Sequence, residues 1–126
     1  MKIKNIDHLV LTVKDIEKSI EFYVNILGFE VIVFGKNRKA LKFGESKINL
    51  HKKGEEFEPK ALNPTCGSAD LCFISETSLE DVLKELKAKN IDIVEGIVKR
   101  TGANGDIKSI YIRDLDKNLI EISVYM

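Results

Sequence analysis

The chain has 126 residues, of which 44% are hydrophobic and 32% are charged. This length and composition are typical of one globular domain with its own apolar core, and they exclude disordered, collagenous and fibrous proteins. Lys plus Arg and Asp plus Glu both number 20, so the formal net charge is zero and nothing favours nucleic acid as a partner. The longest apolar runs fall far below the roughly 20 residues that span a bilayer, so no membrane association is expected.

The N-terminus enters a strand pattern directly, without the apolar core of a signal peptide, and we expect a cytoplasmic protein. The chain has two cysteines, which are too few for a disulfide framework or for a cysteine-based zinc site. We therefore interpret both as reduced thiols.

The first half of the chain predicts four strands and one helix. The helix is predicted over residues 16–27, because Asp15 can cap its start and Gly28 suits its left-handed end. The strands are predicted from β-branched and alternating segments between turn residues. They are residues 6–13, 29–34, 38–43 and 47–51.

The second half repeats this order after a polar stretch, residues 54–67, that holds both prolines. Its helix follows the capping-box pattern of Thr77 and Glu80 and ends near Asn90. The strands are predicted over residues 69–75, 93–98, 107–113 and 118–125. We therefore expect one domain, 1–126, with a first module over about 4–53, a linker over about 54–67 and a second module over about 68–126.

The repeated order predicts an α+β fold in which two βαβββ modules form a cupped mixed sheet with helices on the outer face. Aligning the opening strands of the modules places His8 over Asp70. Aligning the closing strands, on Lys47 to His51 and Lys117 to Glu121, places His51 over Glu121. Strand alternation puts all four side chains on the face turned away from the helices.

Four such side chains on the free face of a sheet can form a cation site, since imidazole suits transition metals and two carboxylates balance a divalent charge. The alternative is that the four groups only face solvent. Both histidines of the chain occupy repeat-matched positions in this alignment, which favours the metal site.

Three segments carry a family resemblance: Ile6 to Asp15, Phe22 to Glu30 and Tyr111 to Ile122. They contain Asp-His-Leu, Phe-Tyr-(x)4-Leu-Gly-Phe and Arg-Asp-x-Asp-x-Asn-Leu-Ile-Glu. Together they resemble the vicinal oxygen chelate superfamily, which includes glyoxalase I, extradiol dioxygenases, fosfomycin-resistance enzymes and bleomycin-binding proteins. The resemblance covers essentially the whole chain and is nearest to glyoxalase-domain-containing proteins.

The resemblance implies paired βαβββ modules with metal ligands on the first and last strand of each, here His8, His51, Asp70 and Glu121. The metal would be Zn, Ni, Mn or Fe. Glyoxalase I usually has Glu in place of His51 and His in place of Asp70, so the metal of one relative does not transfer. Asp70 is short and would bind through water or not at all, which leaves two histidines and one carboxylate.

The leading functional hypothesis is a metal-dependent glyoxalase-like enzyme of the isomerase or lyase kind, acting on a small oxygenated substrate. Glu121 would move the proton. One alternative is a non-catalytic antibiotic-binding or resistance protein, and another is an extradiol-type dioxygenase. The candidate substrate-binding residues are Arg38, Asn49, Arg100 and Tyr111. The resemblance also implies a homodimer, which would cover exposed strand edges.

Overall fold

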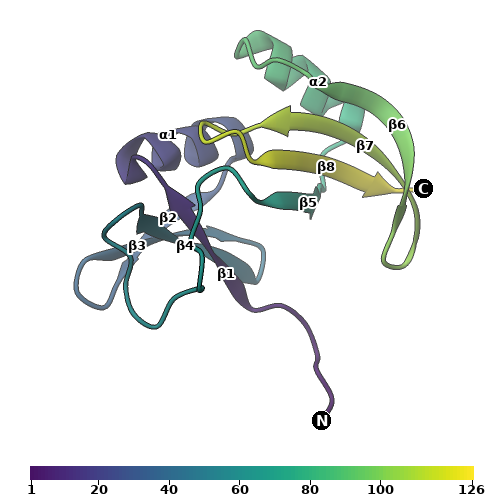
Figure 1. Cartoon of the computed structure of the whole chain (residues 1–126). Helices are drawn as coiled ribbons and strands as arrows, with labels where there is room; N and C mark the ends of the chain where they lie inside the picture. Colours follow the sequence, from purple (N-terminus) through teal and green to yellow (C-terminus); the bar gives the residue numbers. More distant parts are fainter. The chain divides into compact units, whose positions relative to one another are not determined.

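The computed structural model describes residues 1–126, and each half of the chain forms a sheet of its own (Figure 1). Unit 1 is Met1–Cys66 and unit 2 is Gly67–Met126. Both units have the order strand, helix and three strands. The prediction of an α+β fold with two βαβββ modules is therefore confirmed.

Unit 1 has one helix and a four-stranded mixed sheet. Its elements are β1 (His8–Val13), α1 (Ile16–Leu27), β2 (Glu30–Phe34), β3 (Arg38–Phe43) and β4 (Ser46–Lys52). The strand order is β1-β4-β3-β2, with β1 parallel to β4 and the other pairs antiparallel. As predicted, the Asp15 side chain caps α1 by accepting from the Lys18 amide, and Gly28 ends the helix at φ 73°.

Unit 2 repeats this topology. Its elements are β5 (Asp70–Ile74), α2 (Leu79–Ala88), β6 (Glu95–Gly102), β7 (Gly105–Arg113) and β8 (Leu119–Tyr125). The strand order is β5-β8-β7-β6, and β5 is parallel to β8. Neither α1 nor α2 is long and apolar enough to cross a membrane.

Two predicted details of unit 2 are wrong by a few residues. The N-cap of α2 is Ser78 and not Thr77, because the Ser78 hydroxyl accepts from the Asp81 amide. β6 extends to Gly102, well beyond the predicted end at Val98. The reason is that Gly102 and Gly105 pair with each other across a tight hairpin, where the sequence pattern had suggested a longer loop.

Each helix covers the face of its own sheet that the alternation of side chains makes apolar (Figure 1). In unit 1 this face buries Leu11, Val13, Leu41, Ile48 and Leu50, and in unit 2 it buries Ile110, Ile112, Ile120 and Ile122. The opposite face of each sheet carries no helix of its own unit, and we call it the open face of that unit. Val10, on the open face of unit 1, is 45% exposed.

The register of the two parallel strand pairs fixes which residues of the units correspond. His8 pairs with Lys47 in unit 1, and Asp70 pairs with Leu119 in unit 2. The same backbone hydrogen bond precedes each pair, from the Lys47 amide to the Asp7 carbonyl (3.4 Å) and from the Leu119 amide to the Ala69 carbonyl (3.0 Å). Lys47 of unit 1 therefore corresponds to Leu119 of unit 2.

The turn between β7 and β8 ties the closing strand to the opening strand of unit 2. Asn118 is 1% exposed, and its amide nitrogen Nδ2 donates to Asp114 Oδ2 (2.8 Å) while its Oδ1 accepts from the Ala69 amide (2.9 Å). A side chain at Gly67 would place its Cβ 2.4 Å from the Asp116 carbonyl oxygen. Part of the Arg-Asp-x-Asp-x-Asn motif is therefore structural.

Replacing Asn118 by Ala should lower the free energy of unfolding by about 2–3 kcal/mol, because a buried carboxylate and a backbone amide each lose a partner. Urea denaturation followed by circular dichroism measures the change. Asn104→Ala is the matched control, since Asn104 is exposed and its hydrogen bond, to the Tyr125 hydroxyl, comes from the backbone amide and not from the side chain. Equal stability of the two variants would contradict the structural role of the motif.

Candidate functional site

All eight predicted site residues lie on open faces. The unit 1 open face carries His8, Arg38, Asn49 and His51, and the unit 2 open face carries Asp70, Arg100, Tyr111 and Glu121. The alternation of side chains along the strands had predicted this face for His8, His51, Asp70 and Glu121, and the cross-strand pairs agree with it. For example, Cys72 pairs with Glu121, and Glu121 pairs with Tyr111.

The alignment that made His51 the counterpart of Glu121 is wrong. Because Lys47 corresponds to Leu119, Asn49 corresponds to Glu121 and His51 corresponds to Ser123. The match of His8 with Asp70 stands. A shift of two residues leaves every side chain on the same face of a strand, so the alternation of side chains could not reveal the error.

The same register separates the two histidines. His51 pairs with Thr12, which lies four residues after His8. Strands rise about 3.3 Å per residue, so the two backbones lie about 13 Å apart along the strands. The two imidazoles therefore project from different positions along the open face of unit 1, with the pair of Val10 and Asn49 between them. Within either unit, no group of three or more His, Cys, Asp and Glu side chains is placed to hold a metal.

His8 has the surroundings of a metal ligand. Its Nδ1 lies 2.7 Å from Asp7 Oδ2, and hydrogen bonding to His8 lowers the pKa of the Asp7 carboxyl. A carboxylate that accepts from one ring nitrogen fixes the tautomer and leaves the other nitrogen, here Nε2, free to bind. The sequence analysis missed Asp7, although its position next to His8 was a usable signal.

Asn49 carries the one buried side-chain oxygen without a partner. The residue is 6% exposed, and its Oδ1 has no hydrogen-bond donor. A buried polar atom left unpaired is costly, so such atoms often belong to a ligand site. Asn49 pairs with Val10, two residues after His8, which puts it about 7 Å from His8 along the strands.

The Glu121 carboxylate is held from one side by two buried hydroxyls. Its Oε2 accepts from Ser109 Oγ (2.5 Å) and Ser123 Oγ (3.2 Å), and these two hydroxyl oxygens are 2.7 Å apart. Both serines are fully buried. This arrangement fixes the carboxylate at Oε2, and the Tyr111 side chain on β7 also interacts with Glu121. The sequence analysis missed both serines, whose position on the strand face was the only signal.

Asp70 and Cys72 flank Glu121 on the neighbouring strand. Cys72 Sγ lies 3.3 Å from Ser123 Oγ. Burial, and then the negative charges of Glu121 and Asp70, raise the pKa of the Cys72 thiol. The group therefore stays protonated at neutral pH, and Asp70 and Glu121 are the anionic groups of this part of the open face.

Arg100, on the edge strand β6, contacts Tyr111, which is the cross-strand neighbour of Glu121. Arg100 Nε donates to the Tyr111 hydroxyl (3.1 Å), and an Arg100 terminal nitrogen lies 3.3 Å from Glu95 Oε2. Desolvation, more than any other cause, raises the pKa of Tyr111. Arg100 is thus already paired with a carboxylate.

His51 belongs to a different cluster, on the unit 1 open face. It is 3% exposed, its Nε2 lies 3.3 Å from a terminal nitrogen of Arg38, and its ring contacts Phe57 edge to face. Burial, followed by the charge of Arg38, lowers the pKa of His51. The imidazole is therefore neutral at pH 7 and accepts a hydrogen bond from Arg38.

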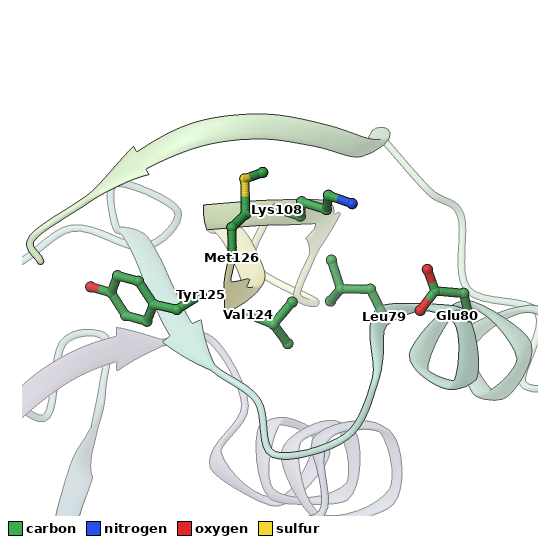
Figure 2. Close-up of a pocket in the computed structure, with 6 residues that line it drawn as sticks. All are labelled: Leu79, Glu80, Lys108, Val124, Tyr125 and Met126. Atoms are coloured by element: carbon green, nitrogen blue, oxygen red, sulfur yellow. The ribbon is translucent and has the colours of Figure 1, made fainter. Parts of the chain in front are cut away.

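A small hollow of about 220 Å³ lies in unit 2 at the start of α2 (Figure 2). Its lining residues are Leu79, Glu80, Lys108, Val124, Tyr125 and Met126. Leu79 and Val124 approach each other there, while the Tyr125 ring points away. None of the predicted site residues lines this hollow.

Comparison with known proteins identifies the family. Residues 5–122 match the model of the glyoxalase/bleomycin resistance protein/dioxygenase superfamily. The chain is 61% identical to virulence protein STM3117 of Salmonella typhimurium over 100% of this chain and 88% of that protein. The crystal structure of STM3117 matches with a TM-score of 0.99 over 100% of both chains.

Two further relatives carry different names. The chain is 56% identical to the glyoxalase domain-containing protein RDO1 of Mycosarcoma maydis, over 99% of this chain and 70% of that protein. It is 33% identical to the metallothiol transferase FosB of Staphylococcus epidermidis, over 95% of this chain and 83% of that protein. The chain belongs to the glyoxalase/bleomycin resistance protein/dioxygenase superfamily, as the sequence motifs had indicated.

The lowered pKa of His51 predicts a loss of stability in acid. As the pH falls below about 6.5, the unfolded chain binds a proton at this residue while the folded chain does not, so folding becomes less favourable. The groups that face His51 are Arg38 on β3 and Glu56 and Lys60 after β4; Glu56 opposes the shift and Lys60 adds to it.

The free energy of unfolding in urea should therefore fall between pH 7.5 and 5.5, and the fall should be smaller in His51→Gln. Each variant is measured against itself across the pH range, which removes any constant effect of the substitution. An unchanged pH dependence in His51→Gln would contradict a neutral, buried His51.

Proposed function

We propose that the protein is a metal-dependent enzyme of the glyoxalase type that moves a proton on a small oxygenated substrate. The observation that carries the proposal is the correspondence of two pairs on the open faces, His8 with Asn49 and Asp70 with Glu121. Each pair has the same offset of two residues between parallel strands. These four side chains supply one imidazole, one amide oxygen and two carboxylates, which suits a divalent transition metal.

In this proposal the ligands are His8 and Glu121, with Asn49 and Asp70 as the oxygen donors at the matching positions. Asn49 replaces His51 in the ligand set that the sequence had suggested. The unpaired Oδ1 of Asn49 and the carboxylate on Nδ1 of His8 support the fit. Oxygen donors outnumber nitrogen in this set, which favours Mn²⁺ or Fe²⁺ over softer ions.

A bound divalent metal would supply electrophilic stabilisation to substrate oxygens and make an adjacent C–H more acidic. Glu121 is the base in our proposal. Ser109 and Ser123 hold its Oε2, so Oε1 is the atom that accepts the proton. A carboxylate that is positioned by two hydroxyls needs little reorganisation for the transfer.

We also propose that the chain acts as a homodimer and that Arg38, Arg100 and Tyr111 contact the substrate. Each four-stranded sheet leaves two edge strands unpaired within its own unit, and association with a second chain would protect such edges. Arg100 and Tyr111 already contact each other, which would orient the guanidinium toward an oxygen-bearing ligand.

The FosB relative supports a second candidate, a metal-dependent thiol transfer. Four possibilities remain to be distinguished: proton transfer, thiol transfer, a dioxygenase reaction and binding without catalysis. They differ in which reactant the protein consumes. The protein is loaded with Mn²⁺, Fe²⁺, Ni²⁺ or Zn²⁺ and assayed with a methylglyoxal–glutathione adduct, catechols and fosfomycin with thiol. Solvent deuterium in the product supports proton transfer, thiol consumption supports thiol transfer, and oxygen uptake supports a dioxygenase.

Calorimetric titration of metal-free protein should show near-stoichiometric binding of a divalent transition metal. Loss of an outer-shell partner costs about 10- to 100-fold in metal affinity, so Asp7→Asn should fall in this range and His8→Ala should exceed it. The matched control is His51→Gln, which should bind as tightly as the parent. A loss in His51→Gln equal to that in His8→Ala would overturn the ligand set.

Glu121→Gln should lower turnover by at least about 100-fold at saturating metal, because the amide cannot accept the proton. The substitution preserves the size of the side chain and a hydrogen-bond acceptor for Ser109. Metal affinity is measured separately, so loss of metal and loss of the base are distinguished. Glu85→Gln, at an exposed position on α2, is the control; near-parental turnover of Glu121→Gln would eliminate the proton-transfer role.

A further inference from the structure

The guanidinium of Arg38 is held in place without a carboxylate. Its Cζ lies 5.0 Å from the centroid of the Phe34 ring and 4.4 Å from that of the Phe57 ring. A terminal nitrogen lies 3.3 Å from Nε2 of the buried His51. No Asp or Glu oxygen is within ion-pair distance of Arg38, unlike Arg100, which pairs with Glu95.

The contacts of Arg38 leave most of its donors unused. A guanidinium has five N–H donors, and the hydrogen bond to His51 accounts for one of them. The aromatic rings stabilise the cation through their faces without accepting a conventional hydrogen bond. Arg38 is only partly buried, and no hydrogen bond of its other donors is seen.

A second cation lies against the same aromatic cluster. The Nζ atom of Lys47 is 3.8 Å from the centroid of the Phe34 ring, and it too has no carboxylate within ion-pair distance. Lys47 and His51 both project from β4 onto the open face, and Arg38 joins them from β3. Two cations, neither of them in an ion pair, thus contact one ring.

Two acidic groups lie near this cluster, and both are engaged elsewhere: Asp7, which the charge of Lys47 affects, lies 2.7 Å from His8 Nδ1, and Glu56 is held by its own segment. Glu56 affects the titration of His51, but its Oε2 accepts from the Gly54 amide (2.8 Å) and its Oε1 lies 3.9 Å from Lys60 Nζ. Its hydrogen bond to Gly54 contributes most to lowering its pKa. Glu56 is therefore stabilised as an anion by its own segment and does not neutralise Arg38.

We propose that the open face of unit 1 binds the oxyanion group of a small molecule, a carboxylate or a phosphate or phosphonate, on Arg38 and Lys47. The rings of Phe34 and Phe57 pack against the guanidinium and restrict its movement, and a guanidinium held in this way suits two-point contact with such a group. His51 accepts a hydrogen bond from the same guanidinium. That this molecule is the substrate rests on the proposed function; the anion site itself does not.

The test is a titration of metal-free, full-length protein, observed by ¹⁵N NMR at constant ionic strength, with inorganic phosphate, acetate or methylphosphonate. Neutral acetamide controls for effects of the small molecule itself. The Arg38 Nε–H and Lys47 signals should shift saturably with an anion. Preference for acetate assigns a carboxylate ligand, and preference for phosphate or methylphosphonate assigns the phosphorus oxyanion; either result supports the site.

Arg38→Gln should weaken the binding by about tenfold or more, as expected for loss of a charged hydrogen-bond donor. Lys47→Gln should weaken it less, because it removes charge without the two-point contact. Arg113→Gln is the matched control, since Arg113 is exposed and only donates to the Lys117 carbonyl. Thermal denaturation verifies that each variant is folded, and Phe57→Leu, which removes one ring but no charge, should weaken binding as well.

The proposal is overturned if no anion binds saturably, or if Arg38→Gln and Arg113→Gln bind equally. The calorimetric metal titration on the same preparation is independent of this result. Anion binding without metal binding would leave this site standing while the metal-dependent function fails. Metal binding without anion binding would overturn the anion site and leave the metal-dependent function standing.

Discussion

The parallel pairing of the first and last strands in each unit is the constraint on which the rest of the site depends. In a parallel pair, the register decides which side chains lie beside each other on a face, and no turn between the two strands sets it. Here the register is defined by matching backbone hydrogen bonds at the start of both pairs. It places Asn49 beside Val10 and Glu121 beside Cys72, and so it decides which groups can act together.

The helices, the order of the elements along the chain and the open faces could be predicted because each depends on local patterns. Asp15 and Gly28 mark the ends of α1 by capping and by a left-handed residue. The alternation of apolar and polar residues determines the faces. The register between β1 and β4 has no such local signal, since a shift of two residues changes no side chain's face. That is why His51 was matched with Glu121 while Asn49 holds that position.

Contacts made by residues distant in sequence could not be predicted either. Phe57 lies in the polar stretch after β4, where no periodicity assigns it a neighbour, yet its ring contacts both His51 and Arg38. The hydroxyls of Ser109 and Ser123 meet only because β7 and β8 pair side by side. In each case the residue type can be read from the sequence, but its partner is determined only by the folded structure.

The helix-covered faces of the two units are alike, whereas their open faces differ. The covered face must exclude water and fill space, which restricts its residues to similar apolar side chains in both units. The open face is free of that requirement, and the units differ there in charge. Unit 1 presents Arg38 and Lys47 beside aromatic rings, whereas unit 2 presents Asp70 and Glu121 beside hydroxyls.

The difference in charge suits the open faces of the two units to different ligands. Each open face considered by itself has a different effect on an anion: Arg38 and Lys47 attract it on unit 1, and Asp70 and Glu121 repel it on unit 2, since opposite charges attract and like charges repel most strongly where water is excluded. A divalent metal on Asp70 and Glu121 would remove that repulsion. In the proposed function the acidic open face therefore needs a cation before it can act on an anionic substrate, whereas the anion site proposed on the basic open face does not.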